Sequence, residues 1–233
     1  MSAQNKLCLA LDVDTFEDAK ALIDSLQSSV GMFKVGKQLF TRVGPKIVDY
    51  IQSKGSEVFL DLKFHDIPST VRKAAYAVSD MGVALFNVHA MGGKDMMEGA
   101  AQGIQDAESS KSKVLGVTVL TSMDQETLSK DLKVNDSVEK YVIHLAKLAK
   151  FSGLNGVVAS PHEIKLIREH CGKDFLIVTP GIRPEWANKG DQKRIMTPKQ
   201  AIEAGADYIV IGRPITKADD PVIAAEKILQ EMA

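Results

Sequence analysis

The chain has 233 residues, which is long for a typical single domain but ordinary for an α/β barrel that folds as one unit. Hydrophobic residues make up 45% and charged residues 25%, the composition of a soluble globular protein. The 29 basic and 30 acidic side chains give a net charge of -1, so no basic surplus suggests a nucleic-acid partner. No apolar run is long enough to span a bilayer, and the first residues lack a signal-peptide pattern. We therefore expect a cytoplasmic protein that binds neither nucleic acid nor membrane.

Short apolar runs and longer amphipathic stretches alternate along the chain, which predicts alternating strands and helices. The predicted strands are Leu7–Leu11, Met32–Val35, Val58–Leu62, Ala84–Val88, Val114–Leu120, Gly156–Ala159, Phe175–Val178 and Tyr208–Ile211. The predicted helices are Phe16–Leu26, Leu39–Ser53, Pro68–Met81, Gly93–Ala107, Val138–Phe151, Pro161–Glu169, Pro198–Ala204 and Pro221–Glu231. Eight such units predict an α/β fold, a single (β/α)8 TIM barrel in which residues 1–233 form one domain. An open doubly wound sheet also alternates strands and helices, but no GxGxxG follows the first strand.

Charged residues gather at the ends of the second and third predicted strands. Asp61 and Lys63 are two residues apart on one strand, so regular alternation directs both side chains to the same face. Lys34 ends the neighbouring strand, and Asp66 follows after a turn. A barrel has its active site at this end. An alternating Lys34-Asp61-Lys63-Asp66 array can stabilise a developing anion and then protonate it. The alternative is a surface ion-pair cluster that adds little stability.

A second candidate site lies near the end of the chain. Gly212 and Arg213 follow the eighth strand, where glycine lets an anion approach the backbone and arginine offers a forked donor. The long segment 180–196 lies between the seventh predicted strand and the helix predicted over Pro198–Ala204, and it contains Arg183 and Gln192. Because barrels often bind phosphate after strands seven and eight, we expect a phosphate site here, covered by this loop. The alternative is a simple turn with a solvated arginine.

The remaining candidate groups favour no other chemistry. Cys8 and Cys171 are far apart and form no CxxC pair, so we predict neither a disulfide framework nor a zinc site. The sequence contains no HExxH, and we predict no metal centre. His89 follows the fourth strand and is interpreted as a hydrogen-bonded structural residue, although contact with a substrate stays open. His65 is assigned no chemical role.

Several motifs together resemble the bacterial-type orotidine 5′-phosphate decarboxylase family, and the resemblance extends through all eight units. The motifs are Leu9-Ala10-Leu11-Asp12, Phe33-Lys34-Val35-Gly36, Asp61-Leu62-Lys63-Phe64-His65-Asp66-Ile67-Pro68-Ser69-Thr70-Val71, Leu120-Thr121-Ser122, Thr179-Pro180-Gly181-Ile182-Arg183, Gly190-Asp191-Gln192-Lys193-Arg194 and Ile211-Gly212-Arg213-Pro214-Ile215. The resemblance implies a dimer of barrels that converts orotidine 5′-phosphate to UMP and CO2 without a cofactor.

The resemblance also implies roles for individual residues. Lys63 is expected to protonate C6 of the pyrimidine, and Asp61 to lie against the departing carboxylate. Lys34 and Asp12 are expected to hold the ribose hydroxyls. The remaining implied substrate contacts are Thr121 and Ser122 at the pyrimidine; Pro180; Arg183, Gln192, Gly212 and Arg213 on the phosphate; and Asp66 and Thr70 in the site of the other subunit.

Two other functions remain open at this point. One is a magnesium-dependent sugar-phosphate decarboxylase or aldol-type synthase that resembles the ketogulonate-phosphate and hexulose-phosphate enzymes. Their Asp-x-Lys-x-x-Asp motif is typically followed by a small residue, whereas Ile67-Pro68 follows it here. The other is a non-catalytic nucleotide sensor. A buried Lys63 between carboxylates disfavours it, because a binding module has no need of an acid in that place.

Overall fold

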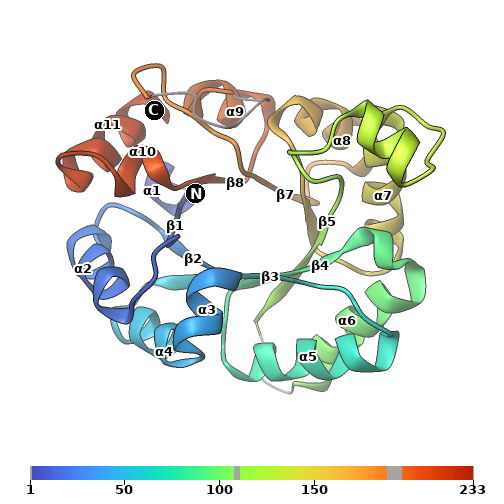
Figure 1. Cartoon of the computed structure of the whole chain (residues 1–233), viewed down its shortest axis with the longest axis horizontal. Coiled ribbons are helices and arrows are strands. Elements are labelled where there is room, and N and C mark those ends of the chain that lie inside the picture. The colour runs from blue at the N-terminus through green and yellow to red at the C-terminus, as the bar shows by residue number, and fades with distance from the viewer. Residues whose placement is uncertain (1, 108–110, 188–195, 233) are drawn as a thin grey trace.

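The eight strands form a closed barrel in the computed structural model, which describes residues 2–107, 111–187 and 196–232. Each strand pairs in parallel with the next, and the eighth pairs with the first. Helices surround the strands on the outside, as Figure 1 shows along the barrel axis. The fold predicted from the sequence, a (β/α)8 barrel, is confirmed. No helix within the described ranges is both long and apolar enough to cross a membrane.

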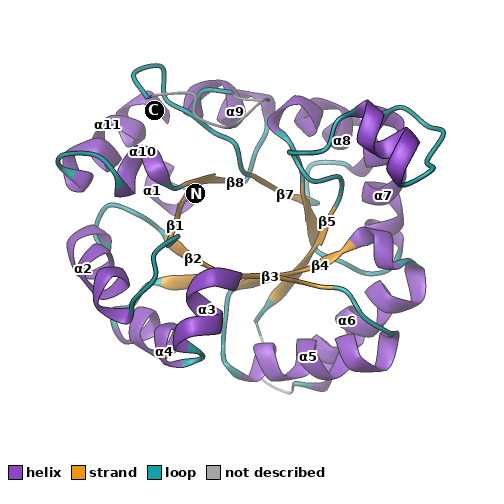
Figure 2. Cartoon of the chain, in the orientation of Figure 1, coloured by secondary structure: helices purple, strands orange, loops and turns teal. Residues whose placement is uncertain are grey.

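Strands and helices alternate along the chain as predicted, and Figure 2 colours the strands orange and the helices purple. The strands are β1 (Leu7–Ala10), β2 (Met32–Gly36), β3 (Glu57–Phe64), β4 (Leu85–His89), β5 (Lys113–Val117), β6 (Gly156–Val158), β7 (Leu176–Thr179) and β8 (Tyr208–Ile211). The α-helices are α1 (Ala3–Lys6), α2 (Phe16–Leu26), α3 (Lys37–Val43), α4 (Lys46–Ser53), α5 (Pro68–Asp80), α6 (Lys94–Asp106), α7 (Val138–Phe151), α8 (Ile164–Cys171), α9 (Pro198–Ala204), α10 (Arg213–Thr216) and α11 (Pro221–Met232). Short 3-10 or π turns occupy Ala90–Gly92, Thr127–Asp131 and Pro161–Glu163.

The structure corrects the predicted elements at three places. The helix predicted over Leu39–Ser53 is two helices, α3 and α4, because Gly44 adopts a φ of 70° and Pro45 follows it. The strand predicted to reach Leu120 ends at Val117. The one-turn helices α1 and α10 were not predicted, since four residues are too few to show a helical period.

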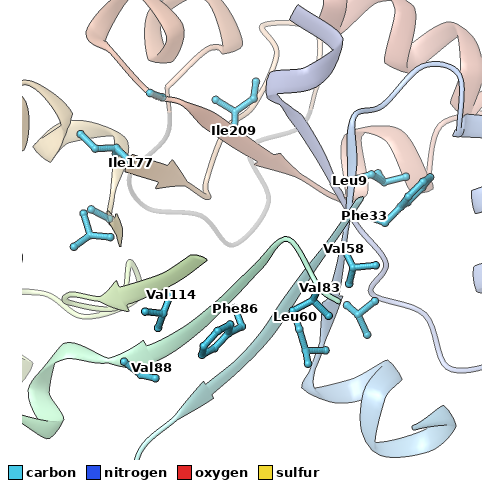
Figure 3. Close-up of a cluster of buried hydrophobic side chains, with 14 of the residues drawn as sticks. Leu9, Phe33, Val58, Leu60, Val83, Phe86, Val88, Val114, Ile177 and Ile209 are labelled. Atoms are coloured by element: carbon cyan, nitrogen blue, oxygen red, sulfur yellow. The ribbon is translucent and has the colours of Figure 1, made fainter. Parts of the chain in front are cut away.

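Side chains of the strands alternate between two apolar layers. Those that point outward, among them Leu9, Phe33, Leu60 and Phe86, pack against the helices and form the larger core cluster (Figure 3). The alternate residues fill the barrel interior, namely Cys8, Ala10, Met32, Phe59, Leu85, Leu115, Val178, Tyr208 and Val210. This alternation determines which side chains reach the catalytic end of the barrel. Two residues after Met32, Phe59 and Leu85 on the same strands, the next inward positions are Lys34, Asp61 and Asn87.

Candidate functional site

A cavity of about 190 Å³ opens at the carboxyl ends of the strands. Its charged wall consists of Lys34, Asp61 and Lys63, which come from β2 and β3. Thr121 and Pro180 also line it. The rest of the lining is apolar: Phe59, Val117, Val119, Leu120, Val158, Ala159 and Val210. Charges on one side and a water-excluding wall on the other strengthen any electrostatic effect on a molecule bound between them.

Four side chains form what we call the charge cluster: Asp12, Lys34, Asp61 and Lys63. The Nζ atom of Lys34 lies 3.4 Å from Oδ2 of Asp61 and 3.3 Å from Oδ1 of Asp12. The Nζ atom of Lys63 forms an ion pair with Oδ1 of Asp61. One carboxylate therefore holds two ammonium groups, one on each oxygen. The sequence prediction that Lys34, Asp61 and Lys63 converge is what the geometry shows.

Mutual attraction keeps Lys34 and Asp61 ionised despite their burial. Burial opposes the charged form of Lys34, but the carboxylates of Asp61 and Asp12 outweigh it, and the pKa of Lys34 is raised. Burial likewise opposes ionisation of Asp61, yet the charges of Lys34 and Lys63 keep the pKa of Asp61 below its usual value. At neutral pH the site therefore contains a carboxylate between cations.

The backbone of β3 is irregular where it positions these groups. Pairing with β4 shifts register between Leu60 and Phe64, and Lys63 has a φ of 53°, which is uncommon for a residue other than glycine. Regular alternation was therefore the wrong reason for expecting Asp61 and Lys63 on one face. A bulge, and not a uniform strand, brings the two side chains together.

Asn87 was assigned no role from the sequence, yet it contacts both residues of the pair. Its Nδ2 donates to Oδ1 of Asp61 over 2.7 Å, and its Oδ1 accepts the backbone N–H of Lys63 over 2.8 Å. The side chain is fully buried. An asparagine in an apolar strand, at the inward position next to a charged strand end, was the only signal that could have identified it.

Asp66 and Thr70 do not reach the charge cluster of their own chain. Both are exposed at the start of α5, and Oδ1 of Asp66 accepts the backbone N–H of Ile67 over 2.6 Å. Within the described part of the chain, no ion pair links Asp66 to Lys63. The single chain therefore supplies Asp12, and not Asp66, as the second carboxylate.

The predicted phosphate residues lie together beyond β7 and β8. Arg183 and Arg213 line a cavity of about 420 Å³ that also includes Lys217. The backbone N–H of Arg183 donates to the carbonyl of Met196 over 3.0 Å, which joins the two ends of the long loop. Gln192 lies outside the described residues.

Gly212 packs tightly between the cavity edge and the first strand. A side chain at this position would approach Cβ of Ala10 to 3.3 Å and Oδ2 of Asp12 to 3.5 Å. Glycine therefore leaves the backbone open next to the charge cluster. Ser122, adjacent to the cavity-lining Thr121, is exposed.

Two histidines lie beside the charged wall. The rings of His65 and His89 are 5.4 Å apart between centroids. Burial, with electrostatic interactions with His65 and Lys37, lowers the pKa of His89 to about 4, so this ring is neutral at pH 7. Within the described residues, no group of three or more His, Cys, Asp or Glu side chains is arranged to hold a metal ion.

The sequence and the fold match known proteins over nearly their full length. The matching family model is described as the orotidine 5′-phosphate decarboxylase / HUMPS family and aligns with residues 5–228. The orotidine 5′-phosphate decarboxylase of Syntrophotalea carbinolica is 54% identical and covers 100% of this chain and 97% of its own length. That of Trichlorobacter lovleyi is 54% identical and covers 99% and 96%. The crystal structure of the orotidine 5′-phosphate decarboxylase from Lactobacillus acidophilus is 39% identical, with a TM-score of 0.86 over 97% of this chain and 98% of that one.

Proposed function

The chain belongs to the orotidine 5′-phosphate decarboxylase / HUMPS family, and we propose that it converts orotidine 5′-phosphate to UMP and CO2 without a metal or organic cofactor. This is the last step of pyrimidine nucleotide synthesis. The main support is the Lys63 ammonium held on Asp61 at the charged wall of a largely apolar cavity. The reaction class follows from this arrangement, because a fixed acid beside a carboxylate suits a carbanion that must be stabilised and then protonated.

Loss of CO2 leaves an electron pair at C6 of the pyrimidine, and without a cofactor only the protein can stabilise it. In the proposed mechanism the Lys63 ammonium stabilises this charge and transfers its proton to C6. Asp61 lies against the departing carboxylate and keeps Lys63 oriented. Lys34 completes the array and, with Asp12, holds the ribose hydroxyls. The short distances from Lys34 to both carboxylates support this assignment.

The apolar part of the cavity is proposed to hold the pyrimidine. Thr121 and Pro180 lie in the lining, and the exposed Ser122 follows Thr121 in the chain. Exclusion of water from the ring strengthens the attraction between Lys63 and the developing charge.

Phosphate is proposed to bind at the neighbouring cavity through Arg183, Arg213 and the backbone at Gly212. Gln192 is assigned here on the family resemblance. The largest enzymatic accelerations correspond to about 23 kcal/mol, more than one ammonium supplies. Binding energy from the phosphate, remote from the reacting carbon, must therefore contribute to the transition state.

We also propose a homodimer whose active sites are shared, with Asp66 and Thr70 entering the site of the other subunit. The exposure of both residues supports this, since neither reaches the charge cluster of its own chain. Ile67 is 64% exposed and Tyr76 46% exposed along α5, as expected of a face that a second copy covers.

The protein is proposed to be cytoplasmic and to bind no nucleic acid. Residues 1–233 are proposed to form one domain, because all eight strands join one barrel.

The test of the reaction is direct. Purified protein treated with EDTA is mixed with orotidine 5′-phosphate, and the loss of ultraviolet absorbance is followed. Turnover in the absence of metal is expected. Absence of turnover would overturn the proposal, and turnover that requires added Mg²⁺ would favour the sugar-phosphate enzymes considered above.

A second experiment tests the shared site. Inactive Lys63→Ala and Asp66→Ala chains are mixed under conditions in which subunits exchange, and activity should partly return in hybrid dimers. If exchange is demonstrated by mass spectrometry and no activity returns, Asp66 acts within its own chain.

A further inference from the structure

Between two successive pairs of the β3–β4 ladder, the bulge places three residues on β3 opposite one residue on β4. Leu60 pairs with Phe86, and the next pair joins Phe64 to Val88. The chain therefore advances four positions on β3 and two positions on β4 between these pairs. Asn87 is the only β4 residue opposite the segment 61–63. A regular ladder cannot pair the backbone groups of this segment, so other partners must satisfy them.

The carboxamide of Asn87 supplies one such partner, to the backbone N–H of Lys63, and also contacts the side chain of Asp61. Its oxygen accepts the Lys63 backbone N–H at 2.8 Å, and its nitrogen donates to Oδ1 of Asp61 at 2.7 Å. A carboxamide offers a donor and an acceptor on one rigid, uncharged plane. The two hydrogen bonds therefore hold Lys63 in its left-handed backbone conformation and fix the rotation of the Asp61 carboxylate. They also add no charge to a site whose charges are already balanced.

We propose that Asn87 is a positioning residue of the decarboxylation site, which keeps the Asp61 carboxylate and the Lys63 backbone in the arrangement that aims the ammonium at the substrate. Oδ1 of Asp61 accepts from both Asn87 and Lys63, which leaves Oδ2 for Lys34. Rotation of this carboxylate would move both ammonium groups together. The inference rests on the proposed function, because it assigns Asn87 to that reaction.

A purely structural role for Asn87 would give different measurements. Filling the barrel interior affects the stability of the fold but not the rate per folded active site. Positioning affects kcat, because a displacement of about 1 Å can lower a rate by about a hundredfold. Binding of the product UMP should change much less, since its proposed phosphate contacts at Arg183 and Arg213 do not involve Asp61. The ratio between the change in kcat and the change in UMP affinity therefore separates the two roles.

The experiment compares Asn87→Ala, Asn87→Asp and Asn155→Ala with the unsubstituted enzyme. Asn87→Ala removes both hydrogen bonds. Asn87→Asp keeps an acceptor for the Lys63 N–H but replaces the donor to Asp61 with a second carboxylate. Asn155 is a matched control, because its Oδ1 accepts the backbone N–H of Val114 over 2.9 Å at the other end of the barrel. Folded sites are counted by UMP titration, and kcat and KM are measured with orotidine 5′-phosphate.

We expect kcat per folded site to fall about a hundredfold in Asn87→Ala and at least as far in Asn87→Asp. The UMP dissociation constant should rise by much less than kcat falls, because the phosphate contacts remain, and Asn155→Ala should keep its kcat. Unchanged kcat in either Asn87 variant, or equal losses of kcat and UMP affinity, would overturn the positioning role. If the unsubstituted enzyme does not turn over orotidine 5′-phosphate, the proposed function fails, and this inference fails with it.

Discussion

Two clusters of charged side chains at opposite ends of the barrel have similar burial but different surroundings. The three members of the charge cluster that line the cavity, Lys34, Asp61 and Lys63, have side chains 12%, 13% and 24% exposed, whereas that of Asp12 is 58% exposed. At the amino ends of β7 and β8, Arg168 and Asp207 form an ion pair with side chains 18% and 21% exposed, which we call the basal pair. Burial and ion pairing alone do not distinguish the two.

The other hydrogen-bond partners of these side chains distinguish the charge cluster from the basal pair. Arg168 donates to the backbone carbonyls of Gly172, Lys173, Phe175 and Gly205, so its guanidinium is fully occupied by the protein. Asp207 also accepts the N–H of Ile177 over 2.8 Å. The ammonium groups of the charge cluster instead have only carboxylate partners among the described residues and face a cavity. An ion pair whose hydrogen bonds are all satisfied stabilises the fold, whereas one left open to a cavity is available for chemistry.

The largest expected effect is the loss of activity in Lys63→Ala. Removing both the acid and the cation next to C6 should lower kcat by at least about 10⁴-fold, since a positioned proton donor alone contributes up to about that factor. UMP binding should survive, because its phosphate contacts are distant from Lys63. The assay is orotidine 5′-phosphate turnover with UMP titration as the control for folding. A kcat near that of the unsubstituted enzyme would remove Lys63 from its role.

Breaking the basal pair should lower the stability of the fold and leave kcat unchanged. Asp207→Ala leaves the Arg168 charge without its carboxylate and the Ile177 N–H without its acceptor, and we expect a loss of about 3 kcal/mol in the free energy of unfolding, the lower end for a buried pair. For a chain of this size that corresponds to a decrease of about 6–12 °C in Tm. Urea unfolding measures the loss. Unaltered stability would mean that the basal pair is no more than a surface ion pair.

The Arg213 site should show an intermediate effect on catalysis. Arg213→Ala is expected to lower kcat/KM by about tenfold to a hundredfold, because a hydrogen bond to a charged group contributes about 1.5–3 kcal/mol. Lys20→Ala, which removes an exposed cation paired with Asp24 on α2, is the matched control and should have no effect. An unchanged kcat/KM in Arg213→Ala would contradict the phosphate assignment.

The smallest expected effect is a pH dependence of stability from His89. Its pKa is about 4 in the folded protein, below the ordinary value of 6.5, so the unfolded chain binds more protons between these values. Stability should therefore be complete above about pH 6.5 and decrease as the pH falls toward about 4. His89→Asn should flatten this part of the profile of urea midpoints. Parallel profiles for the two proteins would show that other groups are responsible.

Most of the barrel could be predicted from the sequence, because burial on both faces gives each strand a short apolar run. Helices α2, α7 and α9 have the predicted bounds for a different reason, because the capping residues Thr15, Ser137 and Thr197 mark their starts. The break at Gly44 was missed although a proline follows it, since the apolar period continues across it.

The site could be predicted only in part. Lys34, Asp61 and Lys63 were identified because charged residues at neighbouring strand ends must meet at one face of a barrel. The β3 bulge and the Asn87 contacts were not, since register depends on pairing with β4 and leaves no local pattern. Asp66 and Thr70 remain predictions, because their proposed partners belong to a second chain.

The central claim is that the charge cluster performs chemistry and the basal pair maintains the fold. It is tested most directly by measuring kcat per folded active site for Lys63→Ala and Asp207→Ala side by side with orotidine 5′-phosphate. We predict that Asp207→Ala keeps the kcat of the unsubstituted enzyme at a temperature where it is folded, while Lys63→Ala loses it. Parallel losses in both variants, or activity in Lys63→Ala, would contradict the claim.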